Sequence, residues 1–143
     1  IKDYKESLQA LDKAIELDPT LAVAHSNRGV TLFAMGKVKE AIKSFRQALE
    51  LKPQVAETHN NLGVALDQIG RHQEANKHFM EALRLRPDYE HAIYNLALNQ
   101  IETGDRVSAQ KQLSFLEKSS SNLAAGLRNF LFQKYVVNVS TFK

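Results

Sequence analysis

Residues 59–87 read HNNLGVALDQIGRHQEANKHFMEALRLRP, and residues 25–53 read HSNRGVTLFAMGKVKEAIKSFRQALELKP. The two stretches lie 34 residues apart, and the same histidine, asparagine, glycine, alanine, phenylalanine and proline positions recur in both. Similarity at a fixed period of this length indicates a stack of repeated units.

The period extends on both sides of these stretches. The recurring columns are Pro19, Pro53 and Pro87; Gly29, Gly63 and Ala97; Gly36, Gly70 and Gly104; Ala41, Ala75 and Ala109; Phe45, Phe79 and Leu113; and Ala14, Ala48 and Ala82. Within each unit, two segments with helical apolar periodicity flank a short turn that contains glycine: AMGK, QIGR or ETGD. Each unit is therefore predicted to be a pair of helices.

The glycines have two different predicted roles. Gly36 and its equivalents follow a helix, where a left-handed residue is easiest for glycine. Gly29 and Gly63 lie inside the first helix, where glycine costs about 1 kcal/mol relative to alanine. That cost predicts a close crossing by the second helix, with Ala41 and Ala75 as the small residues that face the glycines. The prolines stop the second helix.

These columns resemble the tetratricopeptide repeat family, whose 34-residue pattern includes Leu-Gly, an aromatic residue, Ala, Phe, Ala and a closing Pro. The resemblance implies an all-α fold, a right-handed superhelical solenoid of antiparallel helix pairs. We expect one domain over residues 1–143: a half repeat with only a second helix (1–21), two full repeats (22–55 and 56–89), a degenerate repeat (90–121), and a capping helix with an apolar tail (122–143). In the degenerate repeat, Leu116 and Ser121 replace a small residue and the proline.

The two ends of the array differ. Leu123, Leu127 and Leu131 recur at helical spacing, and Leu131 falls in the glycine column, so no close partner helix is expected after this segment. The serines at 119–121 offer an N-cap for it. The first helix lacks its partner and the chain lacks a starting Met, so we expect it to begin inside a longer array.

Composition places the chain among ordinary folded proteins. It has 143 residues, is 43% hydrophobic and 24% charged, and contains no cysteine, which excludes disulfides and thiolate metal sites. It also contains neither a signal peptide nor an apolar run long enough to span a bilayer, so we expect it in the cytoplasm. The net charge of +3 does not suggest nucleic acid or an anionic membrane as partner.

Asn27 returns as Asn61 and Asn95 on the first helices, which the resemblance places on the concave side of the solenoid. An amide donates and accepts hydrogen bonds, as an extended peptide backbone requires. The predicted groove contains Asn27, Val30, Phe33, Asn60, Asn61, Val64, Asp67, Tyr94, Asn95, Leu98 and Ile101. An amide in this column can equally cap or bridge helices within one repeat, so both interpretations stay open.

The family also includes domains that grip a chaperone's C-terminal carboxylate with lysine and asparagine. Here Ser26, Asn60 and Tyr94 occupy the lysine positions, so that clamp is absent. The asparagine row is similar to the inner asparagine ladder of the nucleocytoplasmic sugar-adding glycosyltransferase, but this chain has no catalytic domain.

Other chemistry is weakly represented. His25 and His59 occupy a packing column and are predicted to be structural, while His72 and His78 lie on different helix faces, so neither a metal nor a cofactor is expected. Nucleophile, phosphate-loop and dinucleotide motifs are missing, which argues against an enzyme. The basic stripe of Lys39, Lys43 and Arg46 is interspersed with glutamates, which favours a solvated outer face without nucleic acid.

The C-terminal tail is unusually apolar. Phe130, Phe132, Tyr135 and Val136 exceed what one helix face can bury and predict an interface. Three functions follow: a non-catalytic adaptor that binds a partner's extended or helical peptide in the groove; an assembly module that self-associates or docks through the repeat ends and the C-terminal tail; or a targeting domain of a larger enzyme such as a glycosyltransferase.

Overall fold

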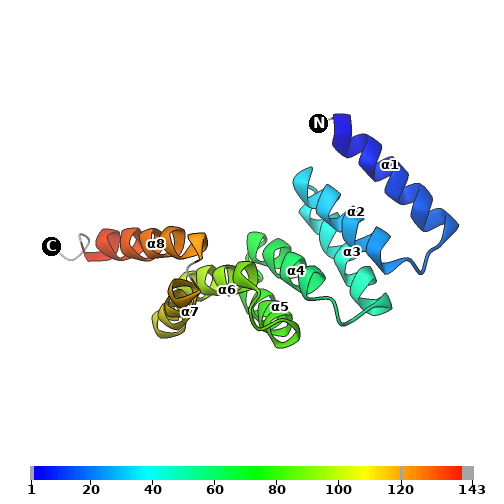
Figure 1. The fold of residues 1–143 in the computed structure, drawn as a ribbon. Helices are drawn as coiled ribbons and strands as arrows, with labels where there is room; N and C mark the ends of the chain where they lie inside the picture. Colours follow the sequence, from blue (N-terminus) through cyan, green and yellow to red (C-terminus); the bar gives the residue numbers. More distant parts are fainter. Residues whose placement is uncertain (1, 120, 140–143) are drawn as a thin grey trace. The chain divides into compact units, whose positions relative to one another are not determined.

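In the computed structural model, every regular element of the described chain is an α-helix, which confirms the predicted all-α class (Figure 1). The structure describes the backbone of residues 2–119 and 121–139, and the side chains of residues 3–119 and 121–131. The chain divides into two compact units, Ile1–Pro87 and Asp88–Lys143. The boundary lies two residues before the predicted end of the second repeat.

The first unit contains five helices: α1 (Lys2–Leu17), α2 (Ala22–Ala34), α3 (Val38–Leu51), α4 (Ala56–Gln68) and α5 (His72–Leu85). Helices α2 and α3 form one pair and α4 and α5 the next, while α1 packs on α2 and α4 on α3. The unit is therefore a stack in which each helix contacts its neighbours in sequence, as expected for a helical repeat protein.

The second unit contains α6 (Glu90–Glu102), α7 (Arg106–Lys118) and α8 (Asn122–Val139). Helices α6 and α7 pair, and α8 packs against both of them. The predicted N-cap is present: the Ser121 hydroxyl accepts a hydrogen bond from the Leu123 N–H (3.2 Å) and donates one to the Glu90 carboxylate (2.8 Å). Leu127 and Leu131 of α8 are buried.

The turn glycines adopt the predicted left-handed conformation. Gly36, Gly70 and Gly104 have φ values of 76°, 77° and 85°. Their N–H groups and those of the next residue bond to carbonyls of the last helical turn, such as Gly70 to Asp67 and Arg71 to Leu66. This closes the first helix of each pair and returns the chain along it.

The prediction that alanines face the helical glycines is wrong in detail. A Cβ atom on Gly29 would lie 2.6 Å from the Phe45 ring, and one on Gly63 would lie 2.6 Å from the Phe79 ring. The rings themselves are buried against the glycine backbone. Glycine is thus required because an aromatic ring occupies the space that a side chain would need; Ala41 and Ala75 are buried as well.

The third repeat has a different pair at the same two positions. Ala97 replaces the glycine and Leu113 replaces the phenylalanine, and both are buried. A smaller side chain on the second helix leaves room for a methyl group on the first, so the packing volume is roughly conserved.

One core position of the third repeat is polar. Gln100 is 8% exposed and lies in the column of Leu32 and Leu66, which are fully buried. Its side-chain oxygen has no hydrogen-bond partner in the described chain. An unpaired buried amide oxygen costs stability.

We predict that Gly63→Ala destabilises the first unit by about 1–3 kcal/mol, because the new methyl group overlaps the Phe79 ring. Urea denaturation measures the effect. Gly126→Ala is the matched control: its Cβ would meet only the Tyr94 side chain, at 3.7 Å or more, so we expect a neutral or stabilising effect. In a Phe79→Leu background, Gly63→Ala should cost less, and an unchanged cost would contradict a clash with the ring.

We predict that Gln100→Leu raises the thermal midpoint, because it removes an unpaired buried oxygen worth about 1–3 kcal/mol and restores the leucine of the other repeats. Calorimetry checks this result. The reverse change, Leu66→Gln, should lower the midpoint. A loss of stability in Gln100→Leu would show that the amide has a structural role.

Candidate functional site

Each first helix exposes the same four register positions, which we call the first-helix stripe. The spacing of four, three and four residues places them on one helix face. The stripe consists of Val23, Asn27, Val30 and Ala34 on α2; Glu57, Asn61, Val64 and Gln68 on α4; and His91, Asn95, Leu98 and Glu102 on α6. Each of these residues is exposed or half-buried. The asparagine row and the aliphatic row therefore lie side by side on an accessible face of each helix.

The other predicted groove residues lie beside this stripe. Asn60 and Ile101 are each only 5% exposed, while Phe33, Asp67 and Tyr94 are half-buried. Neighbouring helices cover this side, as the hydrogen bond between the Ser26 and Thr58 hydroxyls shows (3.0 Å, α2 to α4). The accessible surface is narrower than the sequence suggested.

The side-chain amides of Asn27 and Asn61, in the first unit, make few hydrogen bonds within the protein. Asn27 is exposed, and within the described chain its side chain makes no hydrogen bond; only its backbone carbonyl accepts one, from Thr31. The Asn61 amide oxygen accepts a single long bond of 3.5 Å from Asn60. These amides neither cap nor bridge helices. Asn95, in the second unit, is half-buried and takes part in an interaction.

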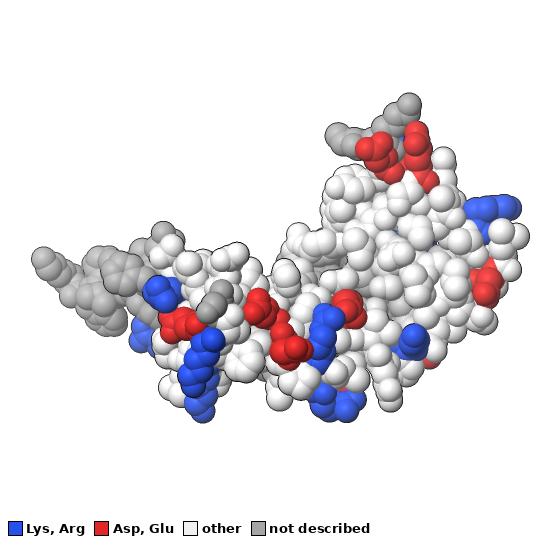
Figure 2. All heavy atoms as spheres, in the orientation of Figure 1, with Lys and Arg blue, Asp and Glu red and all other residues white. Residues whose placement is uncertain are grey.

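The stripe on α2 is uncharged and strongly apolar. Val23 is 61% exposed and Val30 is 46% exposed. The single charged residue of the helix, Arg28, is held away from it: its Nε donates to Asp12 on α1 (2.6 Å) and its Nη1 to Ser44 on α3 (2.8 Å). In Figure 2, the surface where α2 lies shows a broad area without charged side chains.

Charges gather instead on the second helices. Lys39, Lys43 and Arg46 are exposed on α3, and Arg46 pairs with Glu74 of α5 (2.6 Å). The acidic Glu57 of the α4 stripe pairs with Arg86 (2.6 Å). Within the first unit, the stripes thus offer no cation to a carboxylate or phosphate.

The repeated histidines have the structural role that the sequence predicts. Nε2 of His25 donates to the Pro19 carbonyl and Nε2 of His59 to the Pro53 carbonyl, each at 2.9 Å. These bonds tie the start of α2 and α4 to the preceding loop. His59 also contacts His78 of α5, which sequence reasoning missed because no periodic signal links the two positions.

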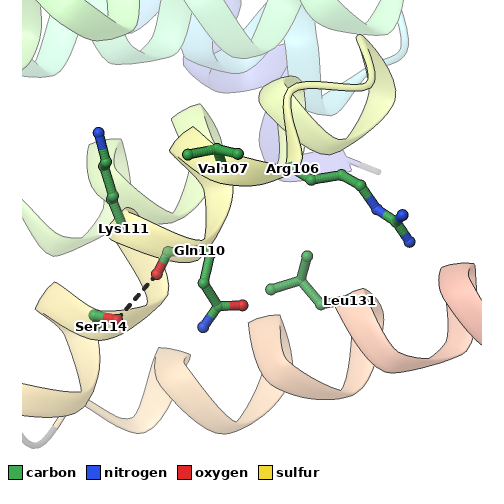
Figure 3. A pocket seen from close by; sticks show the side chains of 6 residues that line it. All are labelled: Arg106, Val107, Gln110, Lys111, Ser114 and Leu131. Carbon is green, nitrogen blue, oxygen red and sulfur yellow. Dashed lines mark hydrogen bonds between the residues drawn. The ribbon is translucent and has the colours of Figure 1, made fainter.

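A surface cavity of about 490 Å³ lies between α7 and α8. Figure 3 shows Gln110 and Leu131 pointing toward one another across it, while the charged ends of Arg106 and Lys111 point away. The Ser114 hydroxyl donates to the Gln110 carbonyl (3.1 Å) rather than to a base. The cavity offers apolar contacts but no nucleophile paired with a base.

Other predicted features are only partly within the described residues. Phe130 is half-buried, whereas the side chains of Phe132, Tyr135 and Val136 lie outside the described residues. Among the residues with described side chains there is no cluster of three histidines or carboxylates suited to a metal ion. Within the described part of the chain, no helix has the length and apolarity to cross a membrane.

Stacked helix pairs with an open stripe on each first helix define an α-helical repeat protein, a class of protein-interaction scaffold. A tetratricopeptide repeat model matches residues 20–88, and a second model of the same repeat matches residues 2–36. The chain therefore belongs to the tetratricopeptide repeat family, as the sequence predicted. No curated protein sequence matches it.

Several solved structures share the fold. A structure titled "Crystal structure of MamA protein" has 25% identity and a TM-score of 0.75, covering 82% of this chain and 64% of that one. Another, "Crystal structure of MamA", has 20% identity and a TM-score of 0.76, covering 97% and 92%. A third, MamA 41-end from Desulfovibrio magneticus RS-1, has 20% identity and a TM-score of 0.76, covering 82% and 66%. This chain thus spans just under two thirds of the first and third of these relatives. Family and fold together support a scaffold that interacts with other proteins.

Proposed function

We propose that the protein is an adaptor whose first-helix stripes bind a peptide segment of a partner protein. The observation that carries the proposal is the pair of Asn27 and Asn61, which recur at the repeat period, lie at the accessible surface and have little use within the fold. An amide at such a position can pair with both the N–H and the C=O of an extended peptide.

The repeat spacing suits this mode. Packed helices lie about 8–10 Å apart, and an extended chain advances about 3.3 Å per residue. One asparagine can therefore meet every third peptide residue. Backbone pairing of this kind gives affinity with little sequence choice.

The aliphatic residues of the stripe supply the choice of side chain. Val30 and Val64 follow Asn27 and Asn61 by three residues on the same helix face, and Leu98 follows Asn95 in the same way. Since the α2 stripe bears no charge, we infer that it favours a partner segment with apolar side chains over an acidic one. Burial of Val23 and Val30 on binding would add to affinity.

We predict that Asn27→Ala, Asn61→Ala and Asn95→Ala together weaken peptide binding about tenfold or more, since each lost hydrogen bond contributes about 0.5–1.5 kcal/mol. Peptides selected from a random library on the wild-type protein serve as probes, and fluorescence polarisation measures affinity. The matched control removes three exposed amides from the second helices: Gln47→Ala, Gln73→Ala and Gln110→Ala. The control variant should bind peptide within about twofold of wild type, because the loss of even one hydrogen bond from the first-helix stripe would weaken binding by more than twofold.

Circular dichroism of both triple variants must show unchanged helix content. Equal binding by the two variants would exclude the asparagine row as the peptide contact. Selection of only acidic peptides would contradict the inferred apolar preference.

A further inference from the structure

The two imidazole rings of His59 and His78 face one another between the helices of the second repeat. Their Nδ1 atoms are 3.0 Å apart, and the ring centroids are 5.3 Å apart with 29° between the planes. The nitrogens are closer than the centroids, so each ring presents its Nδ1 edge to the other. Both side chains are half-buried. The contact joins α4 directly to α5.

Other hydrogen bonds determine which ring donates. A carbonyl oxygen only accepts, so the 2.9 Å bond between Nε2 of His59 and the Pro53 carbonyl requires a proton on that Nε2. Neutral His59 then has a lone pair on Nδ1. A hydrogen bond at 3.0 Å therefore requires His78 to donate its Nδ1–H to His59.

We propose that the His59–His78 pair is a proton-sensitive lock between α4 and α5. The hydrogen bond between the two rings is kept when the pair carries no added proton or one, and it is lost when the pair carries two. The first added proton goes to Nε2 of His78, which leaves its Nδ1–H directed at the lone pair of His59. A second proton on His59 would place two N–H groups against each other across the 3.0 Å contact, between two like charges. That state is compatible only with separated rings.

The surroundings also oppose a charged pair. Burial and the neighbouring His59 lower the pKa of His78 below its ordinary value near 6.5, with Arg46 of α3 adding to the decrease and Glu74 and Glu81 of α5 partly opposing it. Glu74 is shared with Arg46, and Glu81 with Arg84, so neither carboxylate is a dedicated counter-ion. Folding thus favours the neutral form of His78.

The sign of the pH effect follows from this. A histidine whose pKa is lower in the folded state stabilises the fold fully above its unfolded pKa, and that stability is lost as the pH falls below it. The fold therefore loses stability below about pH 6.5, and the lock itself opens at the lower pH where the pair takes up its second proton. Because α4 carries Asn61 and Val64, acid would also weaken peptide capture; only this consequence rests on the proposed function.

The first repeat provides an internal control. His25 makes the same bond to Pro19, but the position equivalent to His78 is Ser44, whose hydroxyl oxygen accepts from Arg28. No imidazole partner faces His25 within the described chain. The chain thus contains one paired and one unpaired copy of the same histidine.

The test is a titration by NMR of the full chain with a chelator present, which excludes metal ions as the cause. Long-range ¹H–¹⁵N spectra should show the Nε2–H form of His59 and the Nδ1–H form of His78 at pH 7.5. Protonation of the pair should proceed in two separate steps, and the lock should be lost only with the second step. Loss of the His59–His78 hydrogen bond with the first added proton, or the opposite tautomers, would overturn the proposal.

Stability provides a second readout. The wild-type urea midpoint should fall between pH 7.5 and pH 5. His78→Gln offers an uncharged amide donor to His59, so the urea midpoint of this variant should fall much less over the same pH range. The urea midpoint of His25→Gln should fall as much as that of wild type. Equal losses in all three would also overturn the lock. Should His78→Gln not fold at pH 7.5, the wild-type titration decides alone. Absence of any bound peptide at either pH would count against the proposed function and leave the lock intact.

Discussion

The rings of Phe45 and Phe79 lie directly against the backbone of Gly29 and Gly63, and the rest of each repeat depends on this contact. A side chain on the glycine would collide with the ring, so the contact fixes both the separation of the two helices and the rotation of the first helix about its axis. A fixed rotation exposes the same four positions in each repeat. The asparagine row is thus a consequence of packing on the opposite face, and its members need no interaction with one another to stay in line.

The sequence predicted those features that follow from one residue and its period. The turn glycines required left-handed backbone, and Gly36, Gly70 and Gly104 adopt it. Prolines and apolar periodicity predicted the number and order of the helices. The asparagine column was predicted to lie on an accessible face, and Asn27 and Asn61 are accessible in the structure. Each of these inferences needed only helix geometry and chain order.

Features that depend on the contact between two helices could not be predicted in this way. The register does not reveal which side chain of the second helix meets Gly63, so alanine was expected where phenylalanine lies. Asn60 was assigned to the groove because it directly precedes Asn61 on the same helix, but one step around the helix was enough to bury it. Only the second repeat has a histidine at both of these positions, so the 34-residue period gave no signal for the His59–His78 contact.

Two repeats have a Gly–Phe pair, and the third has Ala97 and Leu113 at the same two positions. This difference has a consequence for how the repeats of such a chain can diverge in evolution. Moving from the Gly–Phe form to the Ala–Leu form takes two substitutions, and the two orders are not equivalent. Shrinking the ring first leaves a cavity, which a fold can tolerate at some cost in stability. Adding the methyl group first forces it into a ring 2.6 Å away. The steric match therefore couples the two positions, so that a change at one of them alters which side chain the other can accept without loss of stability.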